Sequence, residues 1–244
     1  MHPASTRTTA GRRPIDVTPV LPGPFVVDDA FEDTAVLDAL HHWFLSTPNT
    51  GHLGGFFAPD LSVEHRRVLD WTGGDEDCGE PRLLDWARTL VARVRDTEGA
   101  RRIQACDGRA IRGYEFWGNV SSVRGKTGYH IDRDENVDWV RCMVERIFPV
   151  VSTVTYVGPR AVLRGGDLLV DMGDDAVSFH VRAMRSGMSE AAVIAARDTW
   201  VRIPYRHNRV VVFPGDRPHL VTPLEDAQVL RCAVGVGLWH RVIA

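Results

Sequence analysis

The stretch RVVVFPGDRPHLVT, residues 209–222, decides the fold. Its run of β-branched and aromatic residues predicts a strand over 209–213, and the pair Pro214–Gly215 ends that strand. A second strand is expected over 219–222, after a turn that contains two prolines. His219 therefore begins a strand directly after a turn, a position from which a side chain can serve a binding site.

Further short strands lie around this stretch, and turns separate them. Before residue 110 the periodicity is helical, because apolar residues recur on one helical face. This order predicts a mainly β protein with flanking α-helices, built on a double-stranded β-helix or jelly roll. The expected strands are 114–120, 150–157, 167–170 after Gly165–Gly166, and 229–238; the expected helices are 31–45 and 81–94, with loops at 51–55 and 73–74.

The chain divides into a flexible tail and one domain. Residues 1–23 are expected to form the tail, and residues 24–244 the domain. Within the domain, helical support is expected over about 24–110 and the β core over about 111–244. An insertion over about 172–200 contains a helix-like stretch at 190–198 and is a candidate lid.

Composition excludes several classes of protein. The chain has 244 residues, of which 44% are hydrophobic and 25% charged, and these are ordinary globular values. A formal net charge of −3 offers no positive excess for nucleic acid. No apolar run approaches the roughly 20 residues that cross a bilayer. We therefore expect neither a nucleic-acid nor a membrane partner, while the oligomeric state is not readable.

The four cysteines and the N-terminus indicate the compartment. Cys78, Cys106, Cys142 and Cys232 form no closely spaced metal or redox pair. The N-terminus has no apolar core of a secretory signal. Free thiols and a missing signal favour the cytoplasm.

Three residues form a candidate metal site. In His130-Ile131-Asp132, the first and third side chains point the same way on an extended segment. Alone this pattern is weak, because about one such pair is expected by chance. His219 adds a second histidine, and two histidines with one carboxylate leave positions open on a non-heme iron(II) ion. Zinc is the alternative, although structural zinc usually takes four protein ligands that include thiolates.

Arg231 follows His219 by 12 residues on the next expected strand. Its neighbours on both sides are apolar, and an arginine is rarely buried without a partner. A guanidinium binds a carboxylate through two parallel hydrogen bonds. Arg231 is therefore a candidate carboxylate-binding residue, with a surface arginine as the alternative.

In these residues the sequence resembles the iron(II)- and 2-oxoglutarate-dependent oxygenases, and more closely their prolyl-4-hydroxylase-like branch. The resemblance covers most of residues 24–240. It rests on an ordered series of motifs: YEFWGN at 114–119, His130-Ile131-Asp132, the strand at 152–156, Gly165-Gly166-Asp167-Leu168, the strand at 209–213, His219 and Arg231.

The resemblance implies a jelly-roll enzyme in which His130, Asp132 and His219 hold iron(II). It implies that Arg231 binds the distal carboxylate of 2-oxoglutarate. Tyr156 is either a hydrogen-bond donor to this cosubstrate or a core aromatic residue. Dioxygen would be the second cosubstrate, ascorbate is a candidate reductant, and the products would include succinate and carbon dioxide.

The expected reaction is hydroxylation of an unactivated C–H bond in an amino acid, a peptide or a small natural-product intermediate. Asp132 favours hydroxylation over halogenation, because related halogenases have a small residue there. Desaturation and cyclisation stay open. The alternatives are a cupin-type metalloenzyme that does not use 2-oxoglutarate, and a non-catalytic binding protein on the same scaffold.

Candidate substrate residues lie on segments that border the expected pocket. An arginine cluster would suit a carboxylate-bearing substrate, whereas solvated loop arginines are the alternative. Trp117 and Asn119 either line the pocket or belong to the core and the strand edge. The candidates are Trp117, Asn119, Arg124, Arg133 and His180, with Arg160 and Arg182 nearby.

Overall fold

A computed structural model of the chain describes residues 23–46, 52–69, 83–121, 128–226 and 228–243. Most of the expected tail, the loop at 73–74, Cys78 and Arg124 lie outside the described residues. No helix in the described ranges combines the length and the apolar character that crossing a membrane requires.

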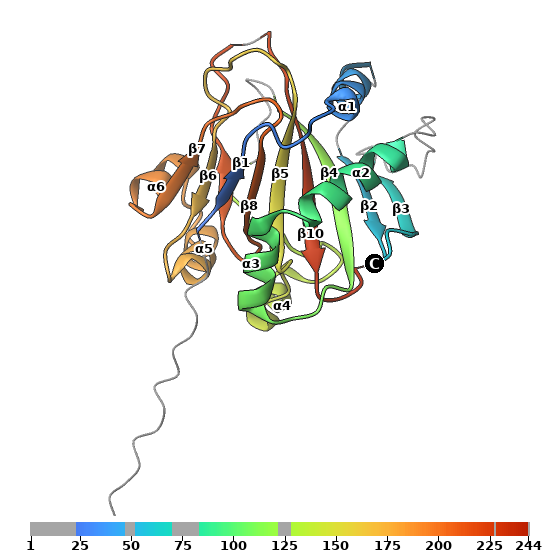
Figure 1. Cartoon of the computed structure of the whole chain (residues 1–244). Coiled ribbons are helices and arrows are strands. Elements are labelled where there is room, and N and C mark those ends of the chain that lie inside the picture. The colour runs from blue at the N-terminus through green and yellow to red at the C-terminus, as the bar shows by residue number, and fades with distance from the viewer. Residues whose placement is uncertain (1–22, 47–51, 70–82, 122–127, 227, 244) are drawn as a thin grey trace, which may run out of the picture.

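A seven-stranded antiparallel sheet forms the centre of the molecule (Figure 1). The long strands β5 and β4 pair with β10 on either side. In sheet order the strands are β1 (Phe25–Val27), β8 (Val210–Pro214), β5 (Val151–Gly158), β10 (Arg231–Trp239), β4 (Gly113–Ser121), β2 (His52–Phe57) and β3 (Val63–Leu69).

A smaller sheet faces the inner side of the larger one. It consists of β7 (Trp200–Ile203), β6 (Leu168–Asp171) and β9 (His219–Val221), and an isolated bridge joins His130 to its edge. One buried cluster fills the space between the sheets with residues from both, including Tyr156, Phe213, Leu168 and Val221. Two facing antiparallel sheets with a shared core make the predicted jelly roll, and the expected fold class is confirmed.

Three helices cover the outer face of the larger sheet: α1 (Ala35–Ser46), α2 (Leu83–Arg95) and α3 (Glu98–Asp107). The apolar face of α1 buries Leu37, Leu40 and Phe44. Thr97 caps α3 through its hydroxyl, and Gly108 ends it in the left-handed conformation. One hydrophobic cluster contains residues of these helices and of the outer faces of β4, β5, β8 and β10. The helices expected at 31–45 and 81–94 are thus confirmed.

The structure differs from the sequence expectations at three places. The segment 51–55, expected to be a loop because of its glycines, contributes His52–Gly55 to β2, where Gly54 and Gly55 pair with β4. Tertiary pairing outweighs the low strand propensity of glycine there. The insertion contains two helices, α5 (Ala176–Arg185) and α6 (Glu190–Ala195), of which only the second had a sequence signal. Helix α4 (Trp139–Glu145), which is not among the helices expected from the sequence, is capped by the side chain of Asp138.

A buried ion pair joins the insertion to the smaller sheet. Arg197 Nε lies 2.9 Å from Asp171 Oδ2, and their side chains are 9% and 0% exposed. Thr199 Oγ1 donates a hydrogen bond to the other oxygen of Asp171. Because Asp171 ends β6, these contacts hold the two helices beside the smaller sheet, as Figure 1 shows for α5 and α6.

Candidate metal centre

His130 and His219 lie directly opposite each other on two antiparallel segments. Their backbones exchange both hydrogen bonds, at 3.0 Å from His130 N to His219 O and 2.8 Å in the reverse direction. Side chains of such a pair share one face of the sheet. The two imidazole rings accordingly lie 4.2 Å apart between centroids.

Asp132 completes the cluster. Its Oδ1 lies 3.4 Å from His130 Nε2 and 3.6 Å from His219 Nε2. Two atoms that each bind one ion at about 2.1 Å can be at most about 4.2 Å apart, so both distances fit a common ion. The three residues form the one group of potential ligands found within the described ranges. His130 is the open side of the cluster, at 37% side-chain exposure against 9% for Asp132 and 6% for His219.

Two main-chain carbonyls orient the imidazoles. His130 Nδ1 donates to Gly128 O at 2.7 Å, and His219 Nδ1 donates to Arg217 O at 3.0 Å. A carbonyl oxygen can only accept, so each Nδ1 carries the proton. Each Nε2 is then left with a lone pair directed at Asp132 and at the place that an ion would take.

Ser152 orients the carboxylate, and the sequence reasoning missed it. Its hydroxyl donates to Asp132 Oδ2 at 2.6 Å, which leaves Oδ1 for the ion. Ser152 lies on the inner face of β5 and is fully buried. The sequence gives no distinct signal for Ser152, because β5 also contains two threonines and a tyrosine.

The protonation states suit metal binding near neutral pH. Burial by itself raises the pKa of Asp132, but the two imidazoles and the Ser152 hydroxyl together lower it to about 2. Burial lowers the pKa of His219 to about 4, aided by the charge of His130. Burial also acts to lower the pKa of His130, yet Asp132 raises it overall. An incoming ion therefore competes with a proton mainly at His130.

Arg231 lies inside the barrel with unpaired donors. It is 1% exposed, and its guanidinium stacks 4.8 Å from the ring centroid of Tyr156. Within the described residues, its Nε and Nη2 and the Tyr156 hydroxyl are buried without hydrogen-bond partners. Unpaired buried donors are costly, and a carboxylate would satisfy this set. The residues thus fit a ligand with a terminal carboxylate.

Two glycines allow the chain to pass close to Arg231. Gly165 and Gly166 have φ values of +73° and +69°, which favour glycine. A Cβ on Gly166 would lie 3.1 Å from Arg231 Cδ and 2.8 Å from a methyl group of Leu224. The Gly165–Gly166 motif seen in the sequence therefore lets the main chain pack directly against the Arg231 side chain.

The two ends of the interior are joined by β5. Ser152, beside Asp132, and Tyr156, beside Arg231, lie four residues apart on the same face of this strand. At 3.3 Å per residue they are separated by about 13 Å. This span leaves room for a small dicarboxylic acid between the guanidinium and the three candidate metal ligands.

The structure places the remaining candidate substrate residues in different surroundings. Trp117 lies on the inner face of β4, against bare Gly235 of β10. Asn119, two residues along, accepts a hydrogen bond from Ser121. Arg133 donates to Val137 O in its own loop, and His180 is buried on α5 against Tyr129. Only Trp117 and Asn119 of this group share the inner sheet face with Arg231.

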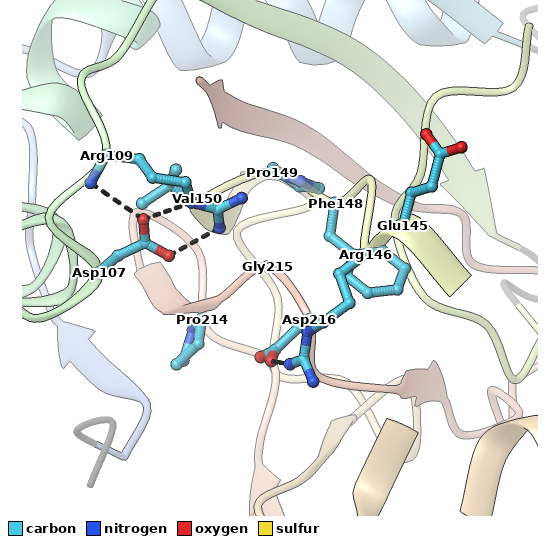
Figure 2. A pocket seen from close by; sticks show the side chains of 10 residues that line it. All are labelled: Asp107, Arg109, Glu145, Arg146, Phe148, Pro149, Val150, Pro214, Gly215 and Asp216. Atoms are coloured by element: carbon cyan, nitrogen blue, oxygen red, sulfur yellow. Dashed lines mark hydrogen bonds and ion pairs between the residues drawn. The ribbon is translucent and has the colours of Figure 1, made fainter. Parts of the chain in front are cut away.

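A separate pocket of ≈ 290 Å³ opens at the end of the barrel near α3 and α4 (Figure 2). Its two arginines are already paired: Arg109 with Asp107 at 2.6 Å and Arg146 with Asp216 at 2.7 Å. None of the three candidate metal ligands lines it. The chemistry of the metal centre therefore lies elsewhere.

Comparisons with known proteins agree with the fold. No protein-family model matches the chain, and no curated protein matches its sequence. Apo HygX from Streptomyces hygroscopicus has a TM-score of 0.53 at 15% identity, over 89% of this chain and 83% of that chain. HygX with iron bound has a TM-score of 0.50 with the same identity and coverage. A Pseudomonas putida prolyl-4-hydroxylase has a TM-score of 0.49 at 14% identity, over 90% and 94% of the chains.

The likeness to HygX shows a common fold at low identity. The chain is a double-stranded β-helix protein, and in fold it resembles the iron(II)- and 2-oxoglutarate-dependent oxygenases. The His130, Asp132 and His219 cluster lies between the two sheets of this fold.

Proposed function

We propose that this protein is an iron(II)- and 2-oxoglutarate-dependent dioxygenase. The proposed reaction hydroxylates an unactivated C–H bond of an amino acid, a peptide or a small natural-product intermediate, with release of succinate and carbon dioxide. The observation that carries the proposal is the buried guanidinium of Arg231, whose unpaired donors share one barrel interior with the metal-ligand cluster. A cupin-type enzyme that does not use 2-oxoglutarate would need such a group only for a carboxylate of its own substrate.

His130, Asp132 and His219 would hold the iron, and Arg231 with Tyr156 would hold the distal carboxylate of 2-oxoglutarate. Bound iron supplies the activation of dioxygen that the reaction needs. Similarity to HygX, which has been crystallised with iron, supports this choice of metal. Three protein ligands leave the other coordination positions for cosubstrates.

The protein's own residues orient and shield the reaction. The carbonyls of Gly128 and Arg217 keep both Nε2 atoms available, and Ser152 keeps Asp132 in one rotamer. The buried cluster around Tyr156 and Phe213 excludes water from the space between the sheets.

Among the described cysteines all thiols are free, which fits the reducing compartment expected from the sequence.

Calorimetric titration of 2-oxoglutarate into the manganese(II)-loaded protein tests the proposal. We expect binding by the wild type and a loss of about 100-fold or more for Arg231→Gln, because a charge-assisted pair is removed. Manganese affinity should be unchanged in this variant. Succinate release with iron(II), ascorbate and candidate substrates then tests the reaction. Equal 2-oxoglutarate affinity in both proteins would instead favour the metalloenzyme that does not use it.

A further inference from the structure

Glu115 places a second carboxyl group inside the barrel. Its neighbours Tyr114 and Phe116 pack into the cluster under the helices, so Glu115 points to the opposite, inner face of β4. In the sheet register Glu115 lies opposite Gly237, and Gly237 lies opposite Ser152. Glu115 and Ser152 thus share one row across three strands. Strands are about 4.8 Å apart, so about 10 Å separates Glu115 from the residue that orients Asp132.

One oxygen of Glu115 is engaged and the other is available. Trp239 is fully buried, and its Nε1 donates to Glu115 Oε2 at 3.0 Å. No hydrogen bond of Oε1 and no ion pair of Glu115 is found among the residues that the structure describes, and the residue is half-buried. The tryptophan therefore fixes the carboxyl group while leaving half of it open to a ligand.

Glycines on β10 make this arrangement possible. A Cβ on Gly237 would lie 2.8 Å from Trp239 Nε1, and a Cβ on Gly235 would lie 2.3 Å from the Trp117 ring. The two indoles thus occupy the space that the glycines leave beside Glu115. Trp239 packs in a buried cluster with Cys142 and Ile147, so it serves to fix Glu115. Trp117 is only half-buried, and its flat apolar ring suits the carbon skeleton of a ligand whose polar group meets Oε1.

The partly buried carboxyl group of Glu115 favours a cationic ligand. Its desolvation is the main cause that raises the pKa of Glu115 to about 8, and the negative charge of Asp132 adds to it. A positive group on a ligand would compensate the charge of Glu115 once it is ionised. Of the described arginines named from the sequence, Arg160 pairs with Asp38, Arg182 pairs with Asp175, and Arg133 donates to Val137 O. These contacts leave none of the three paired with Glu115.

We propose that Glu115 is a specificity-determining residue that binds an amino group of the substrate beside the metal centre. The ammonium N–H donates to Oε1, while Trp239 retains its bond to Oε2. Ionising Glu115 at pH 7 costs about a factor of ten, which the charge-assisted hydrogen bond must exceed. This inference rests on the proposed function and assigns a class of substrate to it.

The test compares three probes with the same four-carbon chain: butylammonium, butanol and butyrate. Each is titrated into full-length protein that carries ¹⁵N-labelled tryptophan, and the indole N–H signal of Trp239 is followed. We expect butylammonium to shift this signal at a concentration about tenfold lower than butanol does, and butyrate to have no effect. With manganese(II) and 2-oxoglutarate present, the protons of bound butylammonium should relax faster, because the probe lies near the metal.

Glu115→Gln is the decisive variant, since its amide oxygen can still accept from Trp239. It should lose the preference for butylammonium while retaining manganese and 2-oxoglutarate affinity. Glu98→Gln is the matched control, because Glu98 lies on α3 with its side chain 81% exposed. An unchanged preference in Glu115→Gln, or no binding of butylammonium to the wild type, would overturn the inference. The indole signal needs no metal, so failure of the proposed function alone would leave this readout intact.

Discussion

The two ends of the barrel interior handle buried polar groups in opposite ways. Around Asp132, hydrogen bonds within the protein orient each candidate ligand: carbonyls bind the two Nδ1 atoms, and Ser152 binds one carboxylate oxygen, so both Nε2 atoms and Oδ1 are left for an ion. Around Arg231, the described residues leave two guanidinium nitrogens and the Tyr156 hydroxyl unpaired. The first end is oriented before any ligand arrives, whereas the second is complete only with an anion.

This contrast indicates that the two ends of β5 serve different ligands, a metal ion at the Asp132 end and an anion at the Arg231 end. A metal site gains affinity when its ligands are held in place by surrounding hydrogen bonds. A site for a dissociating cosubstrate must instead offer donors that the protein itself does not satisfy. Variants at the Asp132 end should therefore change metal affinity, and variants at the Arg231 end should change anion affinity.

Removing a metal ligand should have the largest effect. We expect Asp132→Ala to weaken manganese(II) binding by more than about 100-fold, beyond the 10–100-fold typical of losing a supporting partner. Calorimetry with manganese measures this. Asp134→Asn is the control, because Asp134 is buried nearby but lies outside the ligand cluster. Similar losses in both variants would place the ion elsewhere.

Lowering the pH should release the metal in two stages. The pKa of His130 is raised above its ordinary value of 6.5, so this residue is the first ligand to take a proton as the pH falls. Affinity should fall about tenfold per pH unit below that pKa, with a steeper fall near pH 4 where His219 also takes up a proton. Above the pKa of His130 the affinity should be flat. Manganese titrations from pH 8 to about 4 check this, and an affinity independent of pH would contradict the assigned ligands.

Removing the partner of Asp132 should have a smaller effect. Ser152→Ala removes the 2.6 Å hydrogen bond and should weaken manganese binding by about tenfold. Ser178→Ala, on the exposed side of α5, should change nothing. If Ser152→Ala instead weakened 2-oxoglutarate binding to the metal-loaded protein while sparing the metal, the division between the two ends would be wrong.

Much of the fold could be predicted from the sequence because its strands are strongly apolar. The stretches at 150–157 and 209–213 contain β-branched runs that few other structures accommodate, and both are strands. Strand β2 could not be predicted, since its glycines acquire strand geometry only by pairing with β4. Helix α5 likewise depends on burial of Ala176, His180 and Ala183 against the smaller sheet.

The candidate site likewise contains some residues that could be predicted from the sequence and others that could not. His130, Asp132 and His219 could be proposed from residue type and spacing, because few side chains bind metals. Ser152 and Glu115 could not, because their roles depend on cross-strand register. Glu115 reaches the row of Ser152 only through Gly237 of β10, which follows it by 122 residues.

The smallest effect concerns stability without ligands and should differ in sign between the two ends. Arg231→Met replaces an unpaired buried guanidinium by an apolar side chain, which should raise the free energy of unfolding by about 1–2 kcal/mol. Loss of the contact with Tyr156 reduces this gain by about 0.5–1 kcal/mol. Ser152→Ala removes a satisfied hydrogen bond and should lower stability by about 1 kcal/mol. Thermal unfolding should show midpoints that move in opposite directions by about 2–4 °C.

Adding 2-oxoglutarate with manganese should stabilise Ser152→Ala but not Arg231→Met, because only the former retains the anion site. A lower midpoint for Arg231→Met without ligands would mean that its guanidinium is already satisfied within the folded chain.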